Sequence, residues 1–133
     1  MAARILIVED NEANLDLVKY LLECSGYTTF VARDGEEGIR MAQAEGPDLV
    51  LCDLAMPVMD GYDMVKRLRH DPLLRTTTVI AITAFSMPGD RDIAIAAGFD
   101  GYLPKPIDPQ TFVQQVESFL HPETRAQRSA PQE

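Results

Sequence analysis

The chain has 133 residues, of which 46% are hydrophobic and 25% are charged, and this composition is typical of one globular domain. Its 21 acidic and 12 basic residues give a net charge of −9, which disfavours direct binding to nucleic acid or to a membrane surface. No apolar run approaches the roughly 20 residues that cross a bilayer, and no signal peptide precedes the first run, so we expect a cytoplasmic protein.

Five short apolar runs alternate along the chain with segments of helical periodicity, as in a parallel α/β sheet with crossover helices. The runs at 5–8, 49–52 and 79–82 are aliphatic without alternation, which is typical of strands covered on both faces. The first two of these predict central strands. The runs at 27–31 and 101–103 contain fewer aliphatic residues and suit the edges of the sheet.

The segments between the runs carry apolar residues at helical spacing, with cap residues or helix breakers at their ends. They predict five helices, around residues 12–25, 34–46, 64–68, 93–97 and 108–120. Asp34 is the expected N-cap of the second helix and Asp108 that of the fifth. The fifth helix has the clearest pattern, because its apolar residues all fall on one face.

The segment that follows Leu120 contains no large apolar residue, so it cannot offset the entropy lost on ordering. We therefore expect residues 1–120 to form the folded domain and residues 121–133 to form a flexible tail. Cys24 and Cys52 lie among aliphatic residues and predict small buried side chains, not a disulfide or a metal site.

Polar side chains follow four of the predicted strands at their carboxyl ends. Glu9 and Asp10 follow the first strand, Asp53 the third, Thr83 the fourth, and Lys105 lies just past the fifth. Each alone is compatible with a helix cap or a solvated loop residue. In an open parallel sheet these ends share one rim, and ligands bind where the strand order reverses. If the first and third strands are neighbours, the three carboxylates converge on one pocket.

Three converging carboxylates repel one another unless a proton or a cation lies between them. Oxygen-only ligands favour Mg²⁺, which accepts one or two carboxylates and keeps several waters. Lys105 supplies a positive charge and Thr83 a hydroxyl donor, which together suit a phosphoryl group carried on a carboxylate beside the metal. The inferred chemistry is phosphoryl transfer to an aspartate.

Four segments of the sequence, residues 5–11, 47–61, 82–84 and 102–106, closely resemble the bacterial response-regulator receiver family. The segments occur in the family's order and at its spacing, and the resemblance extends over residues 4–120. It implies a flavodoxin-like (βα)5 fold: a doubly wound, parallel five-stranded sheet with strand order 2-1-3-4-5.

The resemblance also implies a role for each residue of the acidic site. Asp53 would be the phospho-acceptor, Asp10 a direct Mg²⁺ ligand and Glu9 an outer ligand acting through water. Ala55 would give the metal its main-chain carbonyl. Glu9 replaces the commoner Asp, and Ala55 offers no polar side chain at a position that modulates hydrolysis of the phosphoaspartate in the family.

Further roles follow from the resemblance for residues beyond the carboxylates. Thr83 and Lys105 would contact the phosphoryl oxygens, and the peptide bond between Lys105 and Pro106 would be cis. Tyr102 would be an aromatic switch coupled to Thr83, although an aromatic residue on an edge strand is also explained by packing alone. Phe85 is an apolar residue at a second position that modulates hydrolysis.

The sequence thus predicts a single-domain response regulator of a two-component phosphorelay that uses Mg²⁺ and has no fused output domain. A sensor histidine kinase or a histidine phosphotransfer protein would supply the phosphoryl group. A downstream protein would bind through the fourth helix, fifth strand and fifth helix. The only reactions expected are self-phosphorylation and autodephosphorylation at Asp53, so the protein would not be an enzyme in the usual sense.

Three alternatives have different consequences. The chain could be the receiver of a longer hybrid kinase, which the start at Met1 opposes. It could be a Mg²⁺-dependent phosphohydrolase with an aspartyl-phosphate intermediate, but Ala55 stands where the common fold of that kind has a second acid. A dinucleotide or flavin binder is disfavoured, because residues 9–11 are Glu-Asp-Asn where a phosphate cradle needs glycines.

Overall fold

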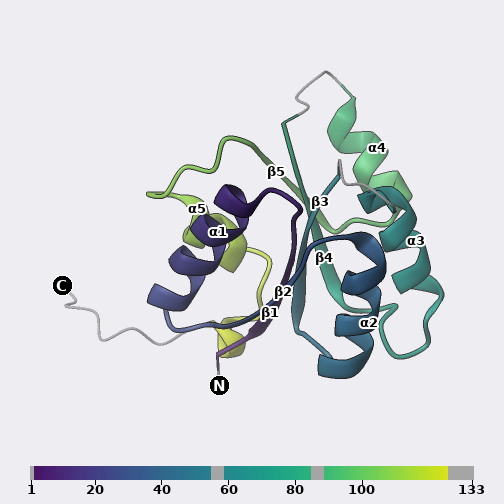
Figure 1. Ribbon diagram of the computed structural model, residues 1–133, viewed down its shortest axis with the longest axis horizontal. Helices are drawn as coiled ribbons and strands as arrows, with labels where there is room; N and C mark the ends of the chain where they lie inside the picture. The colour runs from purple at the N-terminus through teal and green to yellow at the C-terminus, as the bar shows by residue number, and fades with distance from the viewer. Residues whose placement is uncertain (1, 55–58, 85–88, 126–133) are drawn as a thin grey trace.

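Residues 2–54, 59–84 and 89–125 are described by the computed structural model, and within them five parallel strands form one sheet. Its strand order is β2-β1-β3-β4-β5 (Figure 1). The fold class and the strand order are therefore confirmed, and the two runs that are poor in aliphatic residues do lie at the edges. The strands are β1 (Arg4–Val8), β2 (Thr28–Ala32), β3 (Leu49–Asp53), β4 (Thr78–Thr83) and β5 (Gly101–Pro104).

Helices cover both faces of this sheet. The chain winds from β1 to β2 in one direction and then back across β3, β4 and β5, so right-handed crossovers place the helices on opposite sides. One face carries α1 (Glu12–Cys24) and α5 (Phe112–Glu117), and the other carries α2 (Gly35–Glu45), α3 (Gly61–His70) and α4 (Asp90–Ala97) (Figure 1). None of the helices in the described ranges is long and apolar enough to span a membrane.

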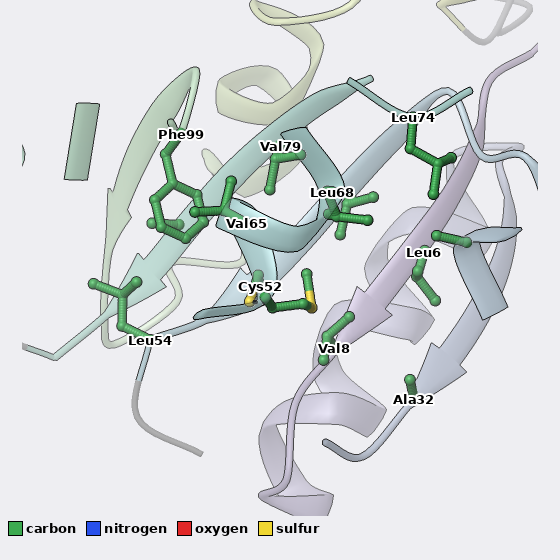
Figure 2. Packing of buried hydrophobic residues seen from close by; sticks show 14 of the residues in the cluster. Leu6, Val8, Ala32, Cys52, Leu54, Val65, Leu68, Leu74, Val79 and Phe99 are labelled. Atoms are coloured by element: carbon green, nitrogen blue, oxygen red, sulfur yellow. Dashed lines mark hydrogen bonds between the residues drawn. The ribbon is translucent and has the colours of Figure 1, made fainter. Parts of the chain in front are cut away.

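Two hydrophobic cores lie on the two faces of the sheet, because successive side chains of a strand point to opposite sides. In β1, Leu6 and Val8 face α2 and α3, whereas Ile5 and Ile7 face α1 and α5. Figure 2 shows the first core, in which Val65 and Leu68 of α3 lie over the sheet near Cys52 and Val79. Burying one such aliphatic side chain contributes about 1.5–3 kcal/mol.

Side-chain caps begin three of the helices. Asn11 accepts a hydrogen bond from the Asn14 amide (3.0 Å), and the expected N-cap Asp34 accepts one from the Glu37 amide (2.8 Å). Asp60 caps α3 in the same way. Each cap satisfies a backbone donor that the first turn of a helix leaves without a partner.

The fifth helix begins later than the expected N-cap at Asp108 predicts. Asp108 does not cap α5, which starts at Phe112. The side chain of Asp108 instead accepts from the Gln110 amide at 3.0 Å, and its carbonyl accepts from the Thr111 and Phe112 amides. Residues 108–111 therefore form a turn that precedes the helix, and the helix begins at Phe112, the first residue of the apolar stripe.

The segment that follows Leu120 begins with an ordered turn. A 3-10 helix spans Pro122–Thr124, and the amide of Ala3 donates to the carbonyl of Thr124 at 2.7 Å. The guanidinium of Arg125 donates to the carbonyl of Glu117. The first part of the expected tail is therefore attached beside β1, and residues 126–133 lie outside the described residues.

The first residue of α3 lies against the end of β3. The Gly61 amide donates to the carbonyl of Leu54 at 3.1 Å. A Cβ atom at position 61 would come within 2.8 Å of the Asp53 carbonyl oxygen and 3.0 Å of the Leu54 Cα. Only glycine permits this approach, which fixes the start of α3 against the residue that ends the central strand.

Candidate functional site

The polar residues singled out from the sequence lie along one edge of the sheet. Glu9 follows β1 directly, Asp53 ends β3, Thr83 ends β4 and Lys105 follows β5. Because β1, β3, β4 and β5 are neighbours in that order, these four strand ends are adjacent. The parallel sheet thus brings residues that are nearly a hundred positions apart in sequence to one rim, as predicted.

Three carboxylates form a cluster at this rim. Glu9, Asp10 and Asp53 each offer one oxygen, and these oxygens lie within 4.8 Å of one another. Glu9 and Asp53 are only 4% and 6% exposed, whereas Asp10 is exposed. This donor set contains only oxygen and opens to solvent on the side of Asp10, so its chemistry fits Mg²⁺.

Lys105 supplies the opposite charge in the middle of the site. Its Nζ lies 3.1 Å from Oε1 of Glu9 and 3.2 Å from Oδ2 of Asp53. Burial of the ammonium opposes its charged form, but the hydrogen bonds and charges of Glu9 and Asp53 outweigh that cost and raise the pKa of Lys105. One cation is thus shared by two buried carboxylates.

Glu9 is held by contacts at both of its carboxylate oxygens. Oε2 accepts a hydrogen bond from the Asn11 amide at 3.1 Å, while Oε1 faces Lys105. Burial, followed by the hydrogen bond and the charge of Asp53, raises the pKa of Glu9 to about 7, against the lowering effect of Asn11 and Lys105. The cluster therefore retains affinity for a proton at neutral pH when no cation occupies it.

Thr83 and Tyr102 lie on the next two strands. Thr83 is 1% exposed and follows Ile82, the residue that pairs with Asp53. The Lys105 amide donates to the Thr83 carbonyl at 2.8 Å, which joins the two strand ends. Tyr102 pairs with Ala81, two residues before Thr83, so Tyr102 and Thr83 point toward the face that carries α4.

The remaining predicted site residues have different outcomes. The peptide bond between Lys105 and Pro106 is cis. Ala55 and Phe85 lie outside the described residues, so the expected roles of Ala55 at the metal and of both positions in modulating hydrolysis stay predictions.

Asn11 was not recognised from sequence as a residue of the site. Its side chain caps α1 while its amide donates to Glu9, so the same residue begins the helix and orients the carboxylate. An Asn that follows a strand and precedes a helical pattern is a recognisable N-cap signal. That signal predicts the cap, but not the bond from the amide to Glu9.

Comparisons with known proteins cover nearly the whole described part of the chain. A family model for the response regulator receiver domain matches residues 5–117. The chain is 40% identical over 120 residues to the polar-differentiation response regulator DivK of Brucella ovis, with 90% of this chain and 98% of that protein covered.

Two solved structures extend the likeness to the fold. The chemotaxis response regulator CheY4 of Vibrio cholerae is 30% identical with a TM-score of 0.86, and the match covers 90% of this chain and 100% of that one. The receiver domain of the sensor histidine kinase PA1611 of Pseudomonas aeruginosa is 31% identical with a TM-score of 0.81, covering 90% and 98%. That structure has a magnesium ion coordinated in its active-site cleft.

Proposed function

The chain belongs to the response regulator receiver family of two-component signalling, and from this membership we propose that Asp53 accepts the phosphoryl group. The observation that carries the proposal is the position of Asp53: its Oδ2 lies 3.2 Å from Lys105 Nζ inside a cluster of three carboxylates. A carboxylate that already faces a cation is a suitable nucleophile for phosphoryl transfer and needs no general base.

The transfer exchanges one bond to phosphorus for another. A carboxylate oxygen of Asp53 forms the new O–P bond while the N–P bond of a donor phosphohistidine breaks, and the electron pair of that bond returns to the imidazole nitrogen. Lys105 would then donate to a phosphoryl oxygen, and the Thr83 hydroxyl would donate to another. Thr83 ends the strand next to that of Asp53, and the ammonium of Lys105 lies 3.2 Å from Asp53, so both groups would stabilise the charge carried by those oxygens.

Receiver domains bind Mg²⁺ at an acidic site, and the cluster supports the same role here. Asp10 and Asp53 would hold the metal directly, Glu9 would act through water, and Ala55 would contribute its main-chain carbonyl. Bound there, Mg²⁺ would neutralise charge on the phosphoryl oxygens. Lys105 offsets only one of the charges on Glu9 and Asp53, and the exposed Asp10 has no such contact, so the ionised cluster keeps an excess of negative charge that a cation would offset.

The output of the switch would be protein binding through α4, β5 and α5. Ile93 and Ile95 of α4 are 57% and 43% exposed, and α4 buries only Ala94 among its residues, so this helix offers apolar surface beside Tyr102. A sensor histidine kinase or a histidine phosphotransfer protein would be the donor in the cytoplasm. Residues 1–120 would make up the receiver.

The decisive experiment is intact-mass analysis after incubation with Mg²⁺ and acetyl phosphate. The wild-type protein should gain the mass of one phosphoryl group, and Asp53→Asn should gain none. Asp16→Asn is the matched control, because it removes an exposed carboxylate of α1 away from the cluster. Equal modification of Asp53→Asn and wild type would exclude Asp53 as the acceptor.

A turnover assay with a generic phosphomonoester separates the proposal from phosphohydrolase activity. The structure supports one acceptor carboxylate that is modified in a stoichiometric reaction. Sustained turnover of a generic phosphomonoester that depends on Asp53 would favour the phosphohydrolase instead.

A receiver that forms part of a hybrid kinase is the second candidate, and the likeness to the receiver domain of PA1611 favours it. Immunoblotting of the native protein would decide between the two, because a longer kinase would migrate far above the 14.8 kDa of this chain.

A further inference from the structure

One corner of the molecule has a charge opposite to that of the rest. Residues 66–75 contain Lys66, Arg67, Arg69 and Arg75 against the single acid Asp71, which gives this segment a charge of +3 with His70 neutral. The whole chain carries −9, so all other residues together carry −12. We call the C-terminal half of α3 and the turn that follows it, residues 66–75, the α3 corner.

Three of the four cations at the α3 corner form no ion pair with a carboxylate of the described residues. Ion pairs within 4 Å join Arg4, Lys19, Arg33, Arg69 and Lys105 to carboxylates elsewhere in the molecule. Over residues 2–54, 59–84 and 89–125, no such pair involves Lys66, Arg67 or Arg75, and all three are exposed. These positive charges are therefore available to a ligand.

Two acids near the corner are already engaged. Asp71 accepts hydrogen bonds from the Leu73 amide at 2.9 Å and from the Gln43 side chain at 3.2 Å. Asp100 pairs with Arg69 at 2.7 Å and also accepts from the Val79 amide at 2.8 Å. Within the described residues, no ion pair within 4 Å joins Asp71, Asp100 or Asp63, one turn earlier on α3, to the three unpaired cations.

Arg69 makes the corner rigid. Its guanidinium donates to the main-chain carbonyls of Gly98 (2.7 and 3.0 Å), Arg75 (2.9 Å) and Thr77 (2.6 Å). These bonds join the end of α3 to the turn before β4 and to the end of α4. The turn before β4 also carries Leu73. This residue is 86% exposed, more than any other large hydrophobic residue that the structure describes.

We propose that the α3 corner is a docking surface for an acidic segment of a partner protein. This segment would also carry an apolar side chain that packs against Leu73. Charge complementarity identifies the partner, since an acidic segment is attracted to the +3 of the corner, whereas the rest of the chain carries −12 in total. The helix dipole favours cations such as Arg67 in the last turn of α3, but it accounts neither for Arg75 beyond the helix nor for the exposure of Leu73.

The corner lies at the opposite end of the sheet from the acceptor. Thr78, which follows the corner, pairs with Leu49, whereas Asp53 pairs with Ile82. Four residues of strand separate these levels, about 13 Å at the rise of a β-strand. Binding at the corner should therefore not depend on phosphorylation, so this inference goes beyond the proposed switch and does not require it.

The test is an NMR titration of the full chain with a synthetic peptide of glutamates that flank one leucine. Amide shifts should be confined to residues 66–75 and their neighbours, and affinity should fall as salt rises. The double variant Lys66→Glu/Arg67→Glu should weaken binding about tenfold, because it reverses two charges that contact the peptide. The single variant Leu73→Ser should weaken binding by a similar factor, because it removes one apolar contact. Arg40→Glu/Arg91→Glu, which changes the net charge equally, should bind as wild type does.

Four outcomes would overturn the proposal. One is an absence of peptide binding, and another is binding that is equal in Lys66→Glu/Arg67→Glu and in the control pair. Shifts of the corner amides with protein concentration alone would assign the surface to a second copy of the chain. Tighter binding of phosphatidylglycerol vesicles at the corner would assign it to a membrane. Unchanged thermal unfolding of the corner variants, whose substituted side chains are exposed, ensures that each result reports on binding.

Discussion

The ammonium of Lys105 lies 3.1 Å from a carboxylate oxygen of Glu9, so the glutamate is a partner of the lysine as well as a member of the acidic cluster. Both side chains are largely buried, with exposures of 16% and 5%. Glu9 also accepts from the Asn11 amide, which links the start of α1 to the charge balance of the site. The protonation of Glu9 therefore affects folding as well as chemistry.

The stability of the metal-free protein should depend on pH through Glu9. The pKa of Glu9 is raised from 4.5 to about 7 by burial and by Asp53, so the folded state binds this proton more tightly than the unfolded state. Its stabilising contribution is fully present below 4.5 and is lost as the pH rises through about 7. Urea unfolding in EDTA should show the stability of wild type relative to Glu9→Gln falling across this range, and a difference that is independent of pH would contradict the shift.

Asp10 should control Mg²⁺ affinity. It is the exposed member of the cluster, and one or two carboxylates plus waters form an incomplete cage, so wild type should saturate in the millimolar range or just below it. Asp10→Ala should bind Mg²⁺ far more weakly, as followed by NMR shifts of the amides at the ends of β1 and β3. Asp16→Ala is the control on the exposed face of α1, and an unchanged titration of Asp10→Ala would remove Asp10 from the site.

Thr83 should transmit phosphorylation to Tyr102. Only contacts that differ between two states can shift their equilibrium, and the Thr83 hydroxyl is at the end of the strand beside Tyr102. Thr83→Ala should still be phosphorylated on Asp53 but should lose the phosphorylation-dependent NMR shifts of Tyr102 and most of the gain in partner affinity. Thr76→Ala, at an exposed position, should behave as wild type. Tyr102 shifts in phosphorylated Thr83→Ala that match wild type would disprove the coupling.

Arg69 should be important for stability although it lies far from the chemistry. Its guanidinium satisfies three main-chain carbonyls and pairs with Asp100. Arg69→Met should lower the free energy of unfolding by about 3 kcal/mol, because it leaves several acceptors without their charged donor. Arg67→Met, two residues away and exposed, should change it by less than about 0.5 kcal/mol. Urea denaturation of the two variants gives the comparison, and equal effects would exclude the structural role of Arg69.

The two cysteines should differ sharply in reactivity. The prediction of a buried side chain is confirmed for Cys52 but is wrong for Cys24, which is exposed at the C-terminal end of α1. Burial followed by the charge of Asp53 raises the pKa of the Cys52 thiol. Iodoacetamide should therefore modify one thiol of the native protein and both thiols of the unfolded protein, as counted by intact mass. Native Cys24→Ser should remain unmodified, and rapid labelling of that variant would show that Cys52 is accessible.

The fold and the rim of polar residues could be predicted because their signals are local. The unbroken aliphatic runs around Leu6 and Val50 indicate strands covered on both faces, and the residues directly after them must lie at the carboxyl edge. Parallel pairing then brings Glu9, Asp53 and Lys105 together without any knowledge of side-chain positions. The family resemblance added the order of the strands.

Other features of the structure could not be predicted, because they depend on contacts that no sequence pattern indicates. The partners of Arg69 are main-chain carbonyls, including that of Gly98, 29 residues away, so no complementary side chain marks them in the sequence. The pKa of Glu9 depends on how close Asp53 comes after folding. The late start of α5 at Phe112 is hidden because Asp108 and the proline after it look like an N-cap and a first helical residue, whereas Asp108 accepts the hydrogen bonds of a turn.

The contact between Gly61 and the end of β3 bears on how variants of this chain should be interpreted. Even the smallest side chain at position 61 would collide with the backbone of Asp53 and Leu54. A screen of random substitutions would thus find position 61 as intolerant as a reacting residue, although it contributes no functional group. Loss of signalling in such a screen can come from the loss of a reacting group or from a steric clash that disturbs the fold. Substitutions at position 61 would serve as the reference for the steric cause.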